Sequence, residues 1–342
     1  MKRMISLAMA LILCLALFAG CGQSGSEGSP NPSISPEQAS DTPSTRTKVN
    51  FAVLSGPTGI GAAKLLEDAE AGRTTNDYDV TIAAAPDELT GKIINGDLDI
   101  AAMSTNLALT LFNKTDGEVQ MLAINTLGVL YILENGDTIQ SMADLEGKTI
   151  YAFGQGANPE YALNYLLEQN GLKAGEDVTV EFKSNEEIIT AMASGDAEVA
   201  MLPVPAATTV LMKNENVRTA LDLTQEWNEA TDGNSQLTMG CIVVRREFAE
   251  ENKAAVDAFL EEYSASVTYV KENVEDASKL VEQFNLTGDA QIAAAAIPQC
   301  NLTCITGEEM QSTIGGYYEV LYAAEPSSIG GNLPDDSFYY IP

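Results

Sequence analysis

The chain has 342 residues, with 18 Lys or Arg against 49 Asp or Glu and no His, and its formal net charge at pH 7 is −31. An acidic surface of this kind disfavours nucleic acid and anionic lipid as partners. The absence of histidine excludes Ser-His-Asp and Cys-His catalysis and imidazole metal sites. It disfavours an enzyme without excluding carboxylate chemistry.

The first 21 residues have the pattern of a bacterial lipoprotein signal. Lys2 and Arg3 precede an apolar run that ends in Phe18-Ala19-Gly20-Cys21. A charged segment, a short apolar segment and a small-residue cleavage site are typical of an export signal. A cysteine directly after Ala-Gly predicts that residues 1–20 are removed and that Cys21 is lipidated. The alternative is an ordinary signal peptide that contains a cysteine by chance.

Residues 22–47 are rich in Gly, Ser, Pro and Thr and have no apolar periodicity. Such a segment predicts a flexible linker, because it cannot bury enough surface to offset its chain entropy. We therefore expect a lipidated cysteine and a linker in residues 21–47, and a folded body from Lys48 to Pro342. The protein would be anchored by lipid on the extracytoplasmic face of a bacterial, Gram-positive cell membrane.

The folded body has the length of two modest domains. After Cys21 no apolar run is long enough to span a bilayer. The longest, Val119–Leu133, is interrupted by polar residues and predicts two buried strands.

An internal duplication organises the body. Residues 48–66 resemble residues 148–166, and residues 87–108 resemble residues 186–207. Each copy predicts a strand, a glycine-containing turn, a helix, a strand, a helix, a turn and a strand. Alternating strands and helices indicate two similar α/β lobes with mixed, mainly parallel sheets. In such sheets ligands bind outside the carboxyl ends of the strands, so we expect a ligand cleft between the lobes.

Two segments outside the copies place a small polar residue and a glycine before an apolar strand. They are Thr126–Glu134 and Thr238–Arg246, and we interpret them as crossover strands that join the lobes. A long amphipathic helix follows the second. The tail from Pro326 to Pro342 contains Phe338-Tyr339-Tyr340, an aromatic cluster expected to pack onto a lobe.

At this point the sequence resembles solute-binding lipoproteins of ABC importers, of the NitT/TauT class with the type II periplasmic-binding-protein fold. The resemblance depends on the signal and linker, on Gly96–Ala101 after a helix, on Asp144–Ile150 opening the second lobe, and on Glu251–Asn273. It implies closure of two lobes on a small solute and delivery to a permease and its ATPase. Relatives bind nitrate, sulfonates, taurine or thiamine-pathway pyrimidines.

The resemblance also implies a discontinuous first lobe, because the family returns the chain to lobe 1 after the second crossover. We expect residues 48–128 plus 244–342 in lobe 1 and residues 129–243 in lobe 2, in a monomer that needs no cofactor or metal.

The candidate site lies in loops at the predicted carboxyl ends of strands. The candidate ligand-binding residues are Ser55, Gly56, Pro57, Thr58, Gly59, Ser104, Thr105, Asn106, Thr126, Gln155, Asn158, Pro203 and Trp227. Each has a structural alternative: a tight turn for the glycines, a helix N-cap for Asn158, and burial at a lobe edge for Trp227 rather than stacking on a ligand ring.

The ligand class follows from the charges near these loops. The strand-end loops are residues 54–58, 103–106, 154–158 and 202–205, and none of the four contains Arg, which a strongly bound dianion usually recruits. Glu160, in the first turn of a predicted helix, already compensates the dipole of that helix. We therefore expect a neutral, zwitterionic or weakly anionic small molecule.

Two alternatives to a transport receptor remain at this point. One is a pathway enzyme with the same fold, which export and the lack of His in the predicted cleft disfavour. The other is a surface lipoprotein that senses a solute. Cys241, Cys300 and Cys304 are expected to be buried free thiols rather than a zinc site, although a disulfide between the last two is an alternative.

Overall fold

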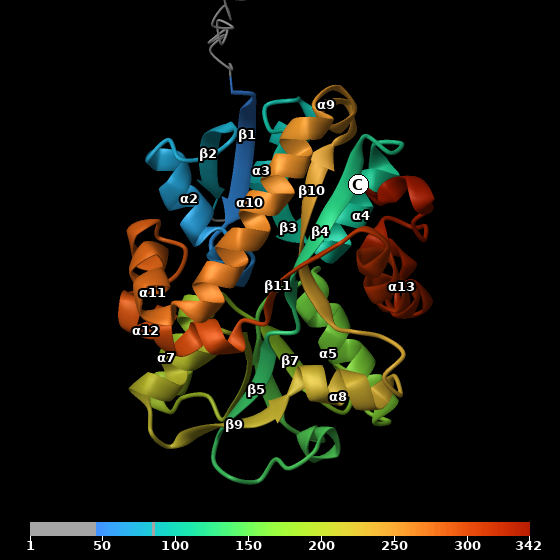
Figure 1. Cartoon of the computed structure of the whole chain (residues 1–342). Helices are drawn as coiled ribbons and strands as arrows, with labels where there is room; N and C mark the ends of the chain where they lie inside the picture. Colours follow the sequence, from blue (N-terminus) through green and yellow to red (C-terminus); the bar gives the residue numbers. More distant parts are fainter. Residues whose placement is uncertain (1–45, 84–85) are drawn as a thin grey trace, which may run out of the picture. The chain divides into compact units, whose positions relative to one another are not determined.

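The computed structural model describes residues 46–83 and 86–342 (Figure 1). The predicted signal peptide, Cys21 and all but the last two residues of the predicted linker lie outside these ranges. The described residues form one compact unit. Within the described ranges no helix is long and apolar enough to cross a membrane.

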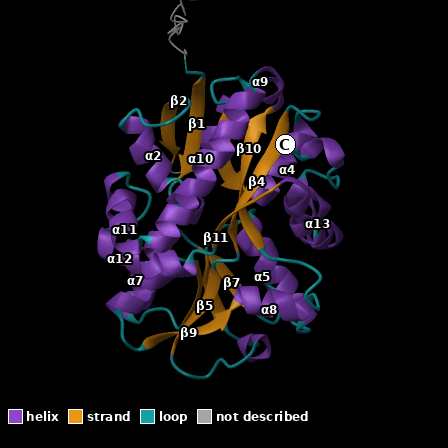
Figure 2. Cartoon of the chain, in the orientation of Figure 1, coloured by secondary structure: helices purple, strands orange, loops and turns teal. Residues whose placement is uncertain are grey.

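The unit contains two sheets (Figure 2). In order across the first sheet, the strands are β11 (Leu302–Thr306), β4 (Val119–Leu127), β10 (Thr238–Arg245), β3 (Ile100–Ser104), β1 (Lys48–Leu54) and β2 (Asp77–Ala83). In order across the second, they are β7 (Thr179–Phe182), β6 (Thr149–Ala152), β8 (Val199–Pro203), β5 (Leu130–Asn135) and β9 (Val217–Asp222). We call the elements around the first sheet lobe 1 and those around the second lobe 2.

The two sheets have matching strand orders. In lobe 1, β1 is parallel to β2 and β3, and β10 is antiparallel to β3 and β4. In lobe 2, β6 is parallel to β7 and β8, and β5 is antiparallel to β8 and β9. In each lobe an antiparallel strand, β10 or β5, is therefore inserted next to a set of parallel strands, which confirms the predicted duplication of mixed α/β lobes.

Helices flank both sheets. Around lobe 1 lie α1 (Pro57–Ile60), α2 (Ala63–Glu70), α3 (Asp87–Ile94), α4 (Thr105–Lys114), α9 (Arg246–Glu251), α10 (Lys253–Glu272), α11 (Val274–Gln283), α12 (Ala290–Ala296) and α13 (Gly307–Ala324). Around lobe 2 lie α5 (Asn158–Gln169), α6 (Asn185–Ser194), α7 (Ala206–Lys213) and α8 (Leu223–Ala230). Short 3₁₀ turns are η1 (Met142–Leu145), η2 (Ile297–Gln299), η3 (Pro326–Ile329) and η4 (Asp336–Phe338).

The first crossover agrees with prediction: β4 ends in lobe 1 at Leu127 and β5 begins in lobe 2 at Leu130. The second is corrected. Strand β10 pairs with β3 and β4 along its length, so residues 238–243, assigned to lobe 2 from the sequence, lie in the first sheet. The loop 231–237 makes the crossing instead. A central strand buried on both faces has the same apolar appearance as a crossover strand, which explains the error.

The predicted amphipathic helix and aromatic tail are confirmed. The apolar stripe of α10, from Val256 to Val270, is buried against lobe 1. Phe338 is fully buried, with its ring centroid 4.9 Å from that of Phe112 in α4. The backbone N–H of Tyr340 donates to the carbonyl of Met121 in β4 over 2.9 Å, and the C-terminus lies beside α4 (Figure 1).

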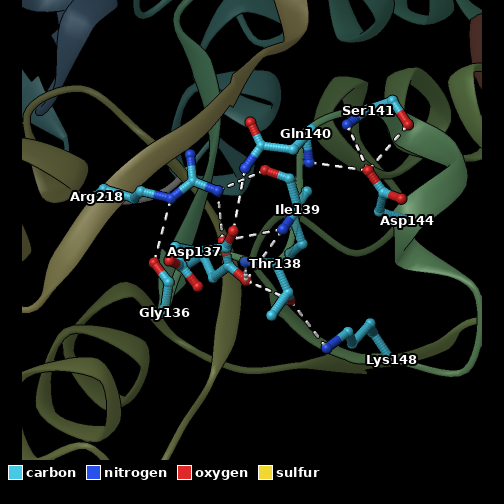
Figure 3. A network of polar contacts seen from close by, with 10 residues as sticks. Gly136, Asp137, Thr138, Ile139, Gln140, Ser141, Asp144, Lys148 and Arg218 are labelled. Carbon is cyan, nitrogen blue, oxygen red and sulfur yellow. Dashed lines mark hydrogen bonds and ion pairs between the residues drawn. The ribbon is translucent and has the colours of Figure 1, made fainter.

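A polar network holds the loop between β5 and β6 (Figure 3). Glu134, on β5, is 3% exposed and accepts hydrogen bonds from the hydroxyl of Thr138 at 2.6 Å and its N–H at 2.8 Å. Arg218, on β9, pairs with the same carboxylate at 2.7 Å. The nearby Asp144 carboxylate accepts hydrogen bonds from the backbone N–H groups of Gln140 and Ser141. The acidic residue that opens the Asp144–Ile150 motif therefore has a structural role, which is to hold this loop.

Candidate ligand-binding cavity

A cavity of about 780 Å³ lies between the two lobes. Its size suits one small organic molecule. The lobe 1 side contributes Leu54–Thr58, Pro86, Ser104, Thr126, Met239, Asn285–Gly288 and Ile292. The lobe 2 side contributes Val129, Phe153, Gly154, Ala157–Pro159, Asn185, Glu186, Ile189, Pro203, Pro205, Ala206 and Thr209. Both sets lie mainly at the carboxyl ends of strands, as the duplication predicts.

Eight of the sequence-predicted residues line this cavity. They are Ser55, Gly56, Pro57, Thr58, Ser104, Thr126, Asn158 and Pro203. The loop after β1 turns at Gly56, whose φ of 105° favours glycine. Its N–H donates to the carbonyl of Leu286 at 2.6 Å, which joins this loop to the connection between α11 and α12.

Four other predicted residues, Gly59, Thr105, Asn106 and Gln155, lie outside the lining. Gly59 packs under β1, where a Cβ would fall 2.2 Å from the carbonyl oxygen of Leu54. The Thr105 hydroxyl donates to the carbonyl of Thr238 at 2.8 Å. Asn106 is buried and donates to the carbonyl of Ser328, whereas Gln155 is exposed. The first three thus have structural roles beneath the cavity.

Trp227 is corrected by the structure. It is fully buried, with its ring centroid 4.9 Å from that of Tyr165 in α5 and 5.4 Å from that of Tyr317 in α13. Its indole N–H donates to the hydroxyl of Ser235 at 3.1 Å. Helix α8 is amphipathic, so its apolar face carries Trp227 into the packing between the lobes, away from a cavity ligand.

Asn158 joins the two lobes at the cavity wall. It begins α5 in lobe 2, and its Nδ2 donates to Thr105 Oγ1 at 2.8 Å and to the carbonyl of Met239 at 3.1 Å, both in lobe 1. Ala157, not Asn158, is the N-cap of α5, and no side chain caps the helix there. The predicted N-cap role of Asn158 is therefore wrong, and its side chain reaches across to the other lobe instead.

A second buried amide fixes the short helix α1. Asn125 Nδ2 donates to the carbonyl of Thr58 at 3.0 Å and to the hydroxyl of Tyr263 at 3.2 Å. Burial raises the pKa of Tyr263, and the bond from Asn125 opposes that shift in part. The close approach needs Gly240, where a Cβ would lie 2.5 Å from Asn125 Oδ1.

Several lining residues were missed from the sequence. Pro86 and Asn185 occupy equivalent positions in the two copies, at the start of α3 and of α6, so the repeat itself contained this signal. Asn285–Gly288 lie between α11 and α12, outside both copies, and only tertiary packing brings them to the cavity. Phe153, Ile189 and Met239 had no distinguishing sequence signal.

The charge of the lining is simple. Glu186 is the one ionisable side chain among the lining residues, and none of them is Lys or Arg. The remaining polar groups are hydroxyls, amides and backbone atoms. In the described ranges no cluster of Cys, Asp or Glu has the arrangement of a metal site. Cys241 and Cys300 are buried and Cys304 is partly buried, all as free thiols.

Two matching α/β lobes with a cavity at the ends of their strands define a two-lobed solute-binding protein. A family model described as the ABC transporter, phosphonate, periplasmic substrate-binding protein matches residues 69–296. The chain belongs to this family, which makes it the solute-binding component of an ABC importer. The resemblance to the NitT/TauT class is thereby supported. Curated protein sequences gave no match to the chain.

Solved structures have the same fold. An ABC transporter protein from Parabacteroides distasonis is 22% identical, with a TM-score of 0.72 over 87% of this chain and 99% of that one. The periplasmic aliphatic sulphonate binding protein SsuA from Escherichia coli is 17% identical, with a TM-score of 0.69 over 86% and 92%. The periplasmic nitrate-binding protein NrtA from Synechocystis PCC 6803 is 16% identical, with a TM-score of 0.52 over 69% and 66%.

Proposed function

We propose that this protein is a lipid-anchored extracytoplasmic receptor that captures a neutral, zwitterionic or weakly anionic small molecule between its lobes. It then delivers that molecule to the membrane permease and ATPase of its importer as a monomer. The observation that carries this proposal is the cavity of about 780 Å³ lined from both lobes, since a ligand there contacts both halves at once. Family membership supports the transport role.

The eight predicted lining residues, from Ser55 to Pro203, are the proposed ligand contacts. To these we add Asn185, Glu186 and the connection Asn285–Gly288, which bring further polar atoms to the same cavity. The lining offers no nucleophile paired with a base, a further reason to prefer binding over catalysis.

The test is thermal unfolding of residues 45–342 against nitrate, sulfonates, taurine, pyrimidines, flavins, amino acids and the low-mass fraction of yeast extract. A ligand at 100 times its dissociation constant adds about 2.7 kcal/mol of stability. Replacing Ser104 by Phe should fill the cavity and abolish the shift, whereas Ser312→Phe on the exposed face of α13 should retain it. No stabilisation by any addition would contradict the proposal.

The proposed anchor is tested separately. Radiolabelled palmitate should be incorporated into the full chain and not into the Cys21→Ala variant, and the variant should leave the membrane fraction. Equal labelling of both would contradict lipidation at Cys21.

A further inference from the structure

The two copies of the duplication differ in their apolar residues at the cavity wall. Phe153 follows β6, lines the cavity and is half-buried. Its equivalent in the first copy, at the constant offset of 100, is Val53, which is fully buried in lobe 1. Lobe 2 therefore has an aromatic ring with accessible surface where lobe 1 has a core valine.

A second difference lies in α6. Ile189 lines the cavity and is half-buried, whereas its equivalent at the offset of 99 is Thr90, whose hydroxyl donates to the carbonyl of Pro86 at 3.4 Å. Phe153 and Ile189 pack against the same apolar cluster of lobe 2. Because the first copy forms the same strand and helix with valine and threonine, the repeated fold does not require these two larger apolar side chains.

Ala206 extends this apolar surface. It begins α7, which packs against α6, and it too is half-buried in the cavity lining. We call Phe153, Ile189 and Ala206 the apolar patch of lobe 2. From lobe 1, Pro57 and Ile292 line the same cavity and are also half-buried. Both lobes thus present apolar surface whose removal from water favours binding of an apolar group.

The polar side chains with accessible surface lie beside this patch and on the opposite lobe. Ser55, Thr58 and Ser104 bring hydroxyls from lobe 1, and Glu186 and Thr209 bring polar groups from lobe 2. A ligand that fills the cavity therefore meets polar groups at one part of its surface and the apolar patch at another.

We infer that the solute has an apolar body, a ring or a branched chain, which lies against the apolar patch of lobe 2 with Phe153 as its main contact. Selection acts on this body, whatever the charge of the polar head group. The inference rests on the proposed function and narrows its ligand class: a solute as small as nitrate, with no apolar body, leaves the patch uncovered and binds weakly.

The first test uses residues 45–342 and the low-mass fraction of yeast extract. The extract is separated on an octadecyl-silica column at neutral pH, and the unretained and retained pools are each tested for thermal stabilisation. Probe pairs that share a head group are titrated by calorimetry: methanesulfonate with benzenesulfonate, methylphosphonate with phenylphosphonate, and glycine with phenylalanine. We expect stabilisation from the retained pool, and tighter binding of the larger member in any pair that saturates the protein.

Variants then test the patch with the compound purified from the stabilising pool. Phe153→Ala should raise its dissociation constant about tenfold or more, and Ile189→Thr, which introduces the residue type of the first copy, about threefold or more. The control is Tyr151→Ala, which removes a half-buried aromatic ring of β6 that packs against the same cluster but is not among the lining residues. It should leave the dissociation constant within about twofold.

The inference is overturned if the stabilising compound passes the column unretained, or if the smaller member of a probe pair binds as tightly as the larger. It is also overturned if Phe153→Ala and Ile189→Thr change the dissociation constant no more than Tyr151→Ala does. Should Phe153→Ala fail to fold, Ile189→Thr decides alone. A protein that no pool or probe stabilises instead contradicts the proposed function itself.

Discussion

Asn158→Ala removes the side chain that links the lobes at the cavity wall. The substitution deletes two buried hydrogen bonds, to Thr105 and Met239. Each buried bond contributes about 0.5–1.5 kcal/mol net, and a buried carbonyl left without a donor costs about 1–3 kcal/mol. Thr105 keeps its bond to Thr238, and loss of the unpartnered Oδ1 offsets part of the cost. We expect the free energy of unfolding without ligand to fall by about 2–3 kcal/mol.

The assay is urea unfolding at 25 °C, monitored by the fluorescence of Trp227. This residue is the one tryptophan in the chain and is fully buried between α5 and α13. The control is Gln155→Ala, an exposed residue of the same loop, which should change the free energy by less than about 0.5 kcal/mol. A loss below about 0.5 kcal/mol in Asn158→Ala would refute the assigned lobe-to-lobe role.

Three further changes probe other parts of the chain. Burial raises the pKa of Glu134, but hydrogen bonds from Thr138, Ile139 and Arg218 outweigh burial and lower this pKa overall. The stability that the charged Glu134 carboxylate gives the fold is therefore present above the unfolded pKa of about 4.3 and is lost as pH falls through the folded pKa. Replacing Glu134 by Gln should therefore lower the free energy of unfolding, measured in urea, by about 2–4 kcal/mol at pH 7 and by less at acidic pH. The loss is limited because the Arg218 side chain is one-third exposed. An equal loss at every pH would contradict this reasoning. Gly59→Ala should destabilise the fold by about 1–3 kcal/mol, because the new Cβ would overlap the backbone of β1. Gly91→Ala on α3, where a Cβ meets open space, should instead stabilise it by about 0.5–1 kcal/mol. The reverse order of stabilities in urea unfolding would refute the packing argument. Burial raises the pKa of Cys304 to about 11, so a disulfide reagent at pH 8 should label it slowly until urea unfolds the chain, and immediate labelling would contradict its burial.

The sequence predicted the lobes well because their signal is repeated. Segments at a constant offset form equivalent strands and turns, and the apolar alternation of each copy matches its sheet. The boundary at residue 243 was wrong because β10 is buried on both faces, and composition does not indicate which sheet such a strand joins. The residues that pair with β10, such as Met103 of β3 and Ile124 of β4, lie far from it in the sequence.

The site was predictable only where it belongs to the repeat. Loop positions after β1 and β3 were found from strand ends, whereas Asn285–Gly288 reach the cavity through helix packing that leaves no local pattern. Trp227 was misassigned because its neighbours in the sequence are polar, although the helix places it on the apolar face. Asn158 was found from its place in a strand-end loop, but its alternative role as an N-cap was wrong, since an asparagine at a helix start has the same sequence context whether it caps the helix or reaches another lobe.

The discontinuous first sheet has a consequence for the order in which the chain can fold. All strands of the second sheet come from one uninterrupted stretch, residues 130–222, so that sheet can assemble as soon as the stretch is available. The first sheet begins at Lys48 and cannot acquire β10 and β11 until later, and the bond from Tyr340 to Met121 waits for the last residues. Because contacts between distant segments form slowly, lobe 1 should be the later lobe to reach its native packing, and the cavity becomes complete only then.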